Sequence, residues 1–258
     1  MPSPHALPAL HHPAAIPVLR RAIGSWRLSV DRVPLHPDEL VARYDRAADG
    51  WGRRLYWSGF SAAYRRLMDE LVAAGPLASL PEGAWVLDAA TGSGALPLAL
   101  DAAHRAVHPA APPLLFTATD RSSAMVRAAR RAFGAAGLDA AVHLADIHRL
   151  PLENEAVDFA MAGHVLEHLA APDAAVRELA RVLRPGAPLL LLTTRPGPIG
   201  ALIHLNWRIR PPAPQTLRTW MRQAGVEVVD VRPLPGPPWC RHATLACIGR
   251  KTASPSPS

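Results

Sequence analysis

The sequence predicts an α/β core built on a doubly wound, mostly parallel sheet. From residue 84 onward, short apolar segments alternate with amphipathic segments of about 10–15 residues, which is the pattern of βαβ units. The run from Leu189 to Leu192 is continuously apolar, as expected of a strand buried on both faces. The last two apolar segments are joined by a proline-rich loop, so one of their strands should run antiparallel to the rest.

The core elements follow in a regular order along residues 81–251. The expected strands have the sequences AWVLDAA, PLLFTATD, DAAVHLADI, AVDFAMAGHV, APLLLLTTR, VEVVDVRPL and HATLACIGR. The expected helices have the sequences GALPLALDAAHRAV, SSAMVRAARRAFGAAG, APDAAVRELARVLRPG and PAPQTLRTWMRQAG. Pro97 falls in a first helical turn, where proline is tolerated, and Gly137 is a helix stop. The fold class predicted is therefore a seven-stranded, mostly parallel sheet with an antiparallel C-terminal strand.

The segments outside the core differ in character. Residues 18–80 are expected to form an N-terminal helical cap, because apolar residues recur there at helical spacing, and its second helix should stop at Gly75. Residues 1–17 and 252–258 are rich in proline, alanine and serine, and we expect both tails to be disordered.

Composition narrows the functional classes. The 258 residues are 49% hydrophobic, enough for a large core, and no run of about 18 apolar residues predicts a membrane span. Two cysteines, Cys240 and Cys247, favour a reducing cytoplasm over a disulfide framework, and neither predicts a metal site. The net charge of +7 comes almost entirely from arginine, without a dense basic block, so nucleic acid is not the expected partner. Arginines precede the first acid, Asp31, so an N-terminal targeting segment stays open.

The strongest motif is VLDAATGSGALPLAL, a strand, a glycine-rich turn and a helix start. Gly92 and Gly94 let the backbone turn tightly and approach a ligand closely. A dinucleotide fingerprint would need a third glycine where Pro97 stands, and it does not call for the strand-end carboxylate of Asp88. That carboxylate suits a ligand ammonium, so the motif favours a cationic amino-acid ligand over a pyrophosphate.

This region resembles motif I of the class I S-adenosylmethionine-dependent methyltransferases, although Ala90 stands where the family has its first glycine. The resemblance runs through about residues 38–250 and is closest to the small-molecule branch, which includes ubiquinone and menaquinone biosynthesis enzymes. It implies a Rossmann-like fold, S-adenosyl-L-methionine as cofactor, and methyl transfer to a small-molecule oxygen, carbon or nitrogen nucleophile by in-line displacement. An RNA or protein methyltransferase and a non-catalytic cofactor-binding protein are the alternatives.

The resemblance also implies a set of cofactor-binding residues. Asp120, at the end of the second core strand, would accept hydrogen bonds from the ribose hydroxyls, with helix capping as its structural alternative. Asp146 would bind the adenine amino group beside Ile147, and Tyr44 would lie near the cofactor's carboxylate, with packing as its alternative. The implied set is Tyr44, Asp88, Ala90, Thr91, Gly92, Gly94, Asp120, Arg121, Met125, Asp146, Ile147 and His164.

The segment GHVLEH has the spelling of an inverted zinc-protease motif. A zinc site would need both histidines on one face of a well-formed helix and a third ligand. Here His164 should lie at the end of a strand, with VLEHL as a short helical turn, so we expect no metal. His164 and His168 are the candidates for a catalytic base, and the alternative is that His168 and Glu167 are structural polar groups. The catalytic residue and the methyl acceptor stay unidentified by the sequence, as does the oligomeric state.

Two further features are interpreted as structural. GPPW, Gly236 to Trp239, resembles the motif of base N-methyltransferases but follows the sixth strand, so we interpret it as a loop. Trp57, Phe60 and Tyr64 are expected to pack within the helical cap, although some could wall the acceptor pocket.

Overall fold

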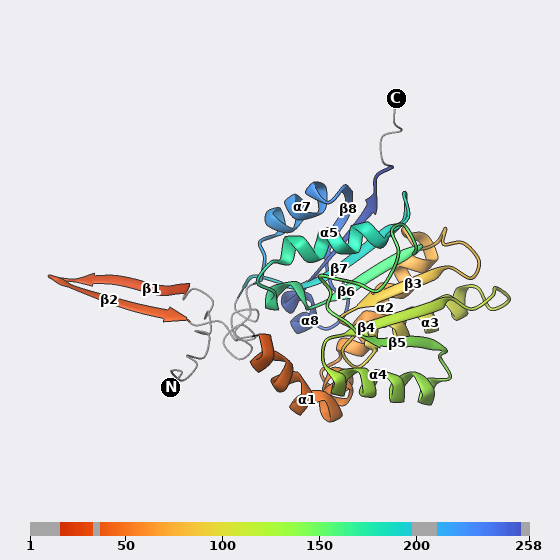
Figure 1. Cartoon of the computed structure of the whole chain (residues 1–258), viewed down its shortest axis with the longest axis horizontal. Helices are drawn as coiled ribbons and strands as arrows, with labels where there is room; N and C mark the ends of the chain where they lie inside the picture. Colours follow the sequence, from red (N-terminus) through yellow and green to blue (C-terminus); the bar gives the residue numbers. More distant parts are fainter. Residues whose placement is uncertain (1–15, 33–36, 198–210, 254–258) are drawn as a thin grey trace, which may run out of the picture. The chain divides into compact units, whose positions relative to one another are not determined.

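The computed structural model describes residues 16–32, 37–197 and 211–253. The chain divides into two units, Met1–Leu40 and Val41–Ser258. The larger unit contains a seven-stranded sheet in the order β5-β4-β3-β6-β7-β9-β8 (Figure 1). Strand β9 is antiparallel to both of its neighbours, and the remaining neighbours are parallel. The predicted fold class, including its antiparallel C-terminal strand, is confirmed.

The strands of the core and the helices between them occur along the chain in the predicted order. The helices before the sheet are α1 (Pro37–Trp57) and α2 (Phe60–Ala74). The core comprises β3 (Trp85–Ala89), α3 (Ala95–Val107), β4 (Leu115–Asp120), α4 (Ser123–Ala136), β5 (Ala140–Leu144), β6 (Phe159–Gly163), the 3-10 turn η1 (Leu166–His168), α5 (Pro172–Val182), β7 (Pro188–Thr194), α7 (Pro214–Gln223), β8 (Val226–Pro233), α8 (Pro238–Ala243) and β9 (Thr244–Lys251).

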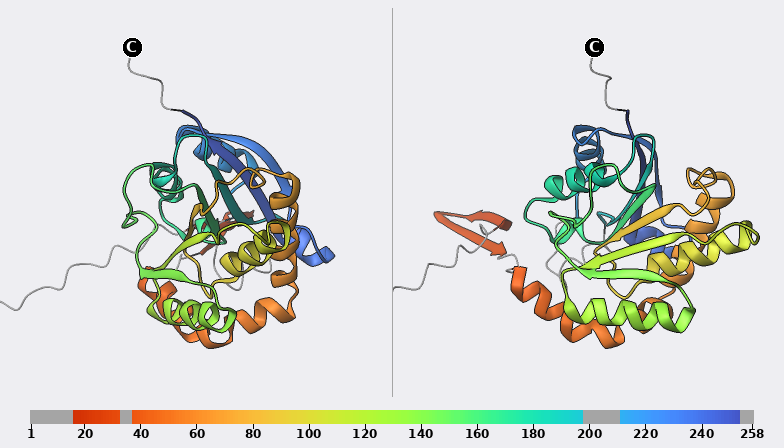
Figure 2. Two further views of the ribbon diagram at one scale, coloured as in Figure 1. Left: turned by 90° about the vertical axis from the view of Figure 1, so that its right-hand side faces the viewer. Right: turned by 45° about the vertical axis from the view of Figure 1, so that its right-hand side comes forward.

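The sheet is covered by helices on both faces, which explains the apolar run in β7. Leu190 and Leu192 pack into the cluster that includes α2, α3 and α4, whereas Leu189 and Leu191 pack into the cluster that includes α5 and α7. Successive side chains of a strand point to opposite faces, so a strand between two helical layers is apolar at every position. Figure 2 shows the two helical layers on either side of the sheet.

The path of the chain creates a switch point beside β3. From β3 the sheet is extended first to β4 and β5 on one side, and then from β6 to β7 on the other. In open α/β sheets, ligands bind at the carboxyl ends of the strands at such a point, because the connecting loops diverge there. The expected site therefore lies where β3, β4 and β6 end.

The helix prediction is wrong for the start of the cap. Strands β1 (Ile16–Ile23) and β2 (Trp26–Arg32) pair antiparallel through a two-residue turn at Gly24–Ser25. Gly24 has a φ of 60°, a backbone conformation that glycine adopts at no steric cost. Two-residue turns with glycine are a hairpin signal that the sequence contained. The predicted disordered tails lie outside the described residues except for 16–17, which begin β1, and 252–253.

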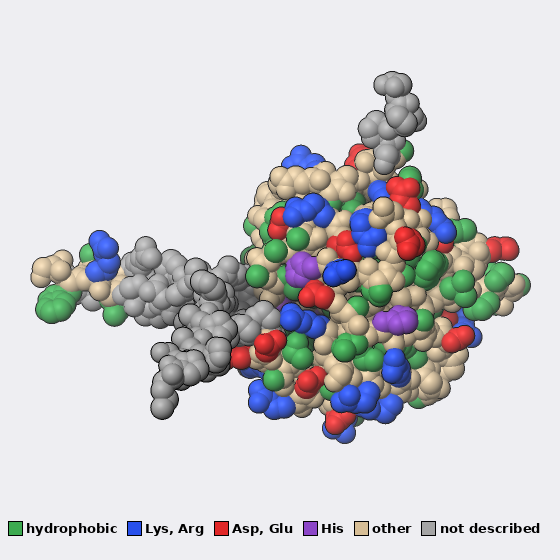
Figure 3. Space-filling model, in the orientation of Figure 1, with side chains coloured by type: hydrophobic (Ala, Val, Ile, Leu, Met, Phe, Trp, Pro, Cys, Tyr) green, Lys and Arg blue, Asp and Glu red, His purple; other side chains and the backbone are tan. Residues whose placement is uncertain are grey.

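Two smaller differences concern the surface. The proline-rich loop before β9, predicted to lack a helix, contains α8, which begins directly after Pro237 and includes Trp239 of the GPPW segment. Acidic and basic side chains intermingle over the face of the core seen in Figure 3. Among the described residues, every helix is too short or too polar to cross a membrane.

Candidate functional site

The loop after β3 has the backbone shape that its glycines predict. Gly92 and Gly94 have φ values of 55° and 83°, and Ala90, in place of the family's glycine, has a φ of 58°. This left-handed region costs a non-glycine residue about 1–2 kcal/mol. A Cβ on Gly94 would lie only 2.4 Å from the ring of Phe133, so α4 closes against the loop and glycine is required there.

Asp88, the penultimate residue of β3, has a buried carboxyl group that lacks a partner among the described residues. Its side chain is 1% exposed, and neither carboxylate oxygen accepts a hydrogen bond within the described part of the chain. Burial raises the pKa of Asp88 to about 8, although the neighbouring Thr91 acts to lower it. Buried polar groups are normally satisfied, so an orphaned carboxylate beside a glycine-rich loop indicates a missing cationic partner.

Asp120, at the end of β4, is bound to the same loop. Its Oδ2 accepts from the Gly92 N–H at 2.8 Å, and its Oδ1 accepts from the Ser122 N–H at 2.8 Å. Ser122, not Asp120, caps helix α4, because its hydroxyl accepts from the Met125 N–H at 3.0 Å. Burial raises the pKa of Asp120 against these backbone bonds. A carboxylate has about four acceptor positions, so two remain for a ligand.

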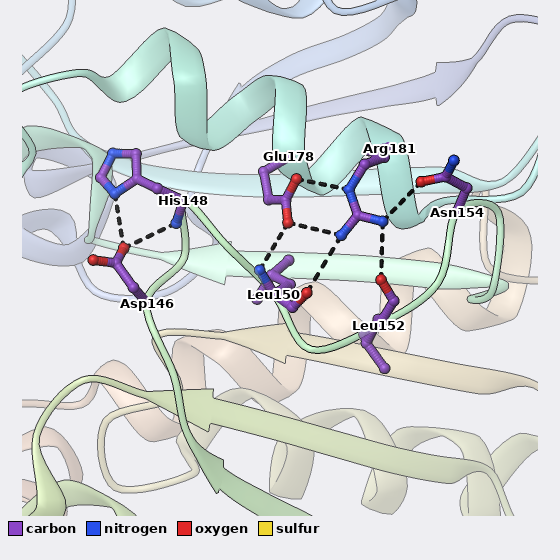
Figure 4. A network of polar contacts seen from close by, with 7 residues as sticks. All are labelled: Asp146, His148, Leu150, Leu152, Asn154, Glu178 and Arg181. Atoms are coloured by element: carbon purple, nitrogen blue, oxygen red, sulfur yellow. Dashed lines mark hydrogen bonds and ion pairs between the residues drawn. The ribbon is translucent and has the colours of Figure 1, made fainter.

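Asp146, after β5, is held by its own neighbours (Figure 4). Its Oδ1 accepts from the His148 N–H at 2.9 Å and contacts His148 Nδ1 at 2.8 Å. Partial burial acts to raise the pKa of Asp146, but these contacts outweigh it and lower the pKa. The other oxygen, Oδ2, forms an ion pair with Arg121, whose Nη1 lies 3.9 Å away. Ile147 beside it is buried in the core.

The loop that follows Asp146 is fixed to α5 by one arginine. Arg181 donates to Glu178 at 2.7 Å and to the carbonyl of Leu152 at 2.9 Å, as the sticks in Figure 4 show. Glu178 in turn accepts from the Leu150 N–H at 2.7 Å. The segment after Asp146 is thereby anchored to a helix of the core, which limits how far the carboxylate can move.

Helix α1 contacts the same end of the sheet. Asp45 accepts a short hydrogen bond from the Ser122 hydroxyl, at the start of α4. Tyr44 and Trp51 pack edge to face, with ring centroids 5.6 Å apart, and both pack against the cluster that contains Met125. The indole of Trp51 also lies near Gly92, where an added Cβ would be 3.9 Å from its Nε1. α1 therefore brings aromatic side chains to the glycine-rich loop.

The end of β6 carries a second polar cluster, around a buried glutamate. Glu167 is 2% exposed, and its Oε1 accepts from the Thr194 N–H at 2.9 Å and from the Thr194 hydroxyl at 2.7 Å. His164 has a φ of 55° and lies with Nδ1 3.3 Å from the same oxygen. Its Nε2 lies 3.3 Å from the hydroxyl of Thr244. Sequence reasoning missed this cluster because Thr194 and Thr244 are far apart along the chain.

His168 faces the opposite way, toward α1. Its Nε2 lies 3.0 Å from the Tyr44 hydroxyl. Burial lowers the pKa of His168 to about 4, and burial raises that of Tyr44, so both side chains are neutral at pH 7. For Glu167, burial acts to raise the pKa, but the contacts with His164 and the charge of the histidines lower it to about 2.

The H-x-x-E-H segment has the geometry that the strand-end interpretation predicts. β6 ends at Gly163, His164 follows, and Leu166 to His168 form only one turn of 3-10 helix. The two histidines contact different elements. Among the described residues, no group of three or more histidine, cysteine, aspartate or glutamate side chains is arranged to hold a metal ion.

The three cap aromatics have different environments. Tyr64 is 5% exposed and belongs to the core, as predicted, and Phe60 is partly buried against it. Trp57 is 79% exposed, so the prediction that it packs in the helical cap is wrong. Phe60 lies edge to face with His164, with ring centroids 6.3 Å apart, which brings α2 beside the end of β6.

The residues at the strand ends fit S-adenosylmethionine. An orphaned carboxylate at Asp88 suits its ammonium, and Asp120 and Asp146 retain acceptor positions for hydroxyl and amino hydrogens. Gly92 and Gly94 leave the loop without side chains where a ligand would approach. Of the implied cofactor set, the strand-end members lie at one edge of the sheet, while Met125 and Ile147 are buried beneath it.

The chain is similar to known methyltransferases. Residues 87–191 match the family of methyltransferase domains. A ubiquinone biosynthesis O-methyltransferase of Xanthomonas axonopodis pv. citri is 27% identical over 181 residues, covering 64% of this chain and 72% of that protein. A 37.1 kDa transposon protein of Streptomyces fradiae is 47% identical over 73 residues, which are 28% of this chain and only 21% of that protein.

A solved structure has the same fold. Magnesium protoporphyrin IX methyltransferase from Synechocystis PCC 6803, with bound S-adenosylhomocysteine, superimposes with a TM-score of 0.58 at 19% identity, covering 76% of this chain and 84% of that one. The shared fold and the match over residues 87–191 agree. Residues 87–191 therefore match a methyltransferase domain, and the chain shares the fold of that methyltransferase.

Proposed function

We propose that this protein transfers a methyl group from S-adenosylmethionine to a small-molecule acceptor. The observation that carries the proposal is the buried, unpartnered carboxylate of Asp88 beside the left-handed loop of Gly92 and Gly94. Burying an unpaired acid is costly, which is why the pKa of Asp88 is raised, and a cationic ligand at this place would offset that cost.

The chain's own residues do the positioning. When bound, S-adenosylmethionine supplies an electrophilic methyl group. Asp88 orients the ammonium of the amino-acid part, Asp120 accepts from the ribose hydroxyls, and Asp146 accepts from the adenine amino group. Methyl transfer needs the nucleophile, methyl carbon and sulfur in line, so fixing these groups in place contributes much of the rate acceleration.

The acceptor would lie over the ends of β6 and β7. His164, with a side chain 28% exposed, is the candidate base at this place, and Phe60 is an apolar wall beside it. His168 is less suited, because it is buried against Tyr44 and its lowered pKa makes it a weak base. The named relatives act in ubiquinone biosynthesis and on magnesium protoporphyrin IX, which supports a small-molecule acceptor.

The proposal extends to the helical cap, the compartment and the partner. Helices α1 and α2 act as a cap on the site, and the chain works in the cytoplasm. Both cysteines are free and buried, which supports a reducing compartment. The mixed charge on the face seen in Figure 3 supports a partner other than nucleic acid.

Calorimetry with S-adenosylhomocysteine tests the cofactor. We expect a dissociation constant of micromolar order, about −8 kcal/mol, and no competition by NAD. Tight NAD binding without S-adenosylhomocysteine binding would reject the assignment. Incubation with S-adenosylmethionine and panels of small phenols, acids and amines, read by a mass increase of one methyl group, tests the acceptor class. An RNA complex that survives physiological salt would instead favour an RNA methyltransferase.

A further inference from the structure

A second concave surface lies outside the cofactor site. It is a groove of about 590 Å³ between α1, α2, α3 and α4, and it lies entirely within the larger unit. This volume falls in the range of small-molecule pockets, about 300–1,000 Å³. Ser93 of the glycine-rich loop forms part of its wall, and an added Cβ on Gly52 of α1 would be 3.5 Å from the Ser93 hydroxyl. The groove therefore adjoins the cofactor loop.

Small residues make the floor of the groove. Ala95, Ala99 and Ala102 recur at helical spacing along α3, and Ala128 and Ala132 face them from α4. Residues at this spacing lie on one face of a helix, so the alanines form a continuous apolar surface. An apolar body could cover this floor and be removed from water.

The rim of the groove is cationic. Arg53, Arg65 and Arg131 line it, and Asp49 is the single acidic residue among its lining residues. Asp49 pairs with Arg131 at 2.9 Å, and Arg65 pairs with Asp69 at 2.7 Å. Within the described part of the chain, Arg53 makes no ion pair or hydrogen bond. The guanidinium of Arg53 is thus left for a ligand. The guanidinium groups of Arg65 and Arg131 belong to exposed ion pairs, which contribute little to stability.

We propose that this groove binds a small amphipathic anion, with a carboxylate or phosphate head at Arg53 and Arg65 and an apolar tail on the alanine floor. The head matches guanidinium chemistry, since planar guanidinium groups pair with carboxylate and phosphate oxygens. The tail matches the apolar floor. The groove is a site distinct from the strand-end site, because the groove is lined by helices and by Ser93 rather than by Asp88, Asp120 or Asp146.

Calorimetry with defined probes tests both halves of the ligand. Decanoate and decyl phosphate should bind, whereas inorganic phosphate, which has the head alone, and decyltrimethylammonium, which has the tail with the opposite charge, should bind at least about tenfold more weakly. Equal binding of inorganic phosphate would overturn the role of the floor. Equal binding of decyltrimethylammonium, or no binding of either decyl anion, would overturn the proposal.

Matched variants locate the binding. Arg53→Gln combined with Arg65→Gln should weaken decanoate at least about tenfold. The control combines Arg54→Gln with Arg66→Gln, which removes the same charge from the next positions of the same helices, exposed and outside the groove. The control should change affinity by less than about twofold. Equal losses of decanoate affinity in the two double variants would show that decanoate responds only to the net charge, and would overturn the site.

A filling variant tests the floor without changing charge. Ala102→Phe should block decanoate, and Ala106→Phe, one turn further along α3 and outside the groove, should not. Thermal melts of all four variants confirm folding. If Ala102→Phe melts like the wild-type protein and binds decanoate normally, the ligand lies elsewhere and the proposal fails.

Discussion

The ends of β3 and β6, here called the first and the second corner of the sheet, surround a buried acidic side chain in opposite ways. At the end of β3, Asp88 accepts no hydrogen bond from the described residues, and its pKa is raised by burial to about 8. Near the end of β6, Glu167 accepts from Thr194 twice and contacts His164, and its pKa is lowered to about 2. We call the first corner incomplete, because the described residues leave both carboxylate oxygens without a partner, and the second complete, because Oε1 has three partners, although Oε2 has none. A buried acid therefore points to a binding site when both of its oxygens lack partners, not merely because it is buried.

Replacing Asp120 should give the largest effect at the incomplete corner. Asp120→Ala should weaken S-adenosylhomocysteine binding by about 2–5 kcal/mol, since bonds to a charged acceptor contribute roughly 1.5–3 kcal/mol each. Titration calorimetry measures this loss. The fold should survive, because Ser122 caps α4. Asp120→Asn keeps one acceptor oxygen and should melt closer to wild type while losing most of the affinity. Full ligand-induced stabilisation in Asp120→Ala would contradict the ribose role.

Replacing Glu167 should do the reverse at the complete corner. Glu167→Ala leaves the Thr194 N–H and hydroxyl without their buried acceptor, which should cost about 2–4 kcal/mol of unfolding free energy. Denaturant titration measures it, with Glu167→Gln, which keeps the acceptor oxygen, as the milder control. Because the folded pKa is lowered, this stabilisation is present above the ordinary carboxyl pKa and is lost as pH falls toward about 2.

The affinity for S-adenosylhomocysteine should change by less than about threefold in the folded Glu167 variants. A large loss of affinity at unchanged stability would mean that the cofactor also contacts the second corner.

The role of Asp88 should be visible in the pH dependence of stability and of cofactor affinity. Its folded pKa is raised, so folding favours the protonated acid, and stability declines as pH rises from the ordinary carboxyl range through about 8. Asp88→Asn should therefore melt at a higher temperature than wild type at pH 9 and at a similar temperature at pH 4. Wild-type affinity for S-adenosylhomocysteine should rise between pH 6 and pH 8, by at most about tenfold per unit, and Asp88→Asn should be weaker and flat. A flat wild-type profile would remove Asp88 from the ammonium site.

Tyr44 should give the smallest effect. Its hydroxyl contacts His168 at 3.0 Å, and Tyr44→Phe keeps the ring against Trp51. We expect a stability loss of about 1 kcal/mol and an affinity change within about threefold. A thermal melt and a titration of the same sample separate the two. Affinity that falls more than about tenfold at unchanged stability would place the hydroxyl on the cofactor instead.

Local sequence signals predicted the core and the tight turn of the loop after β3. Alternating apolar and amphipathic segments specify the seven strands, and the order of an acid, Gly92 and Gly94 specifies a loop whose shape depends on residues within one turn of each other. The contacts of Glu167 with Thr194 could not be predicted that way, because they depend on which strands become neighbours. The prediction that Trp57 packs within the cap was wrong because Trp57 follows the same helical spacing as neighbours that are buried. The hairpin of β1 and β2 was missed although its turn signal, Gly24–Ser25, was present.

The position of β9 has a consequence for synthesis of the chain. β9 lies between β7 and β8, so β9 is the sole neighbour of β8 among the strands that the structure describes. During translation β8 emerges first and must wait, unpaired, until Thr244–Lys251 has left the ribosome. Its exposed edge is then open to pairing with another nascent chain. A chain truncated before Thr244 would therefore contain the glycine-rich loop but would leave the sheet open beside β7.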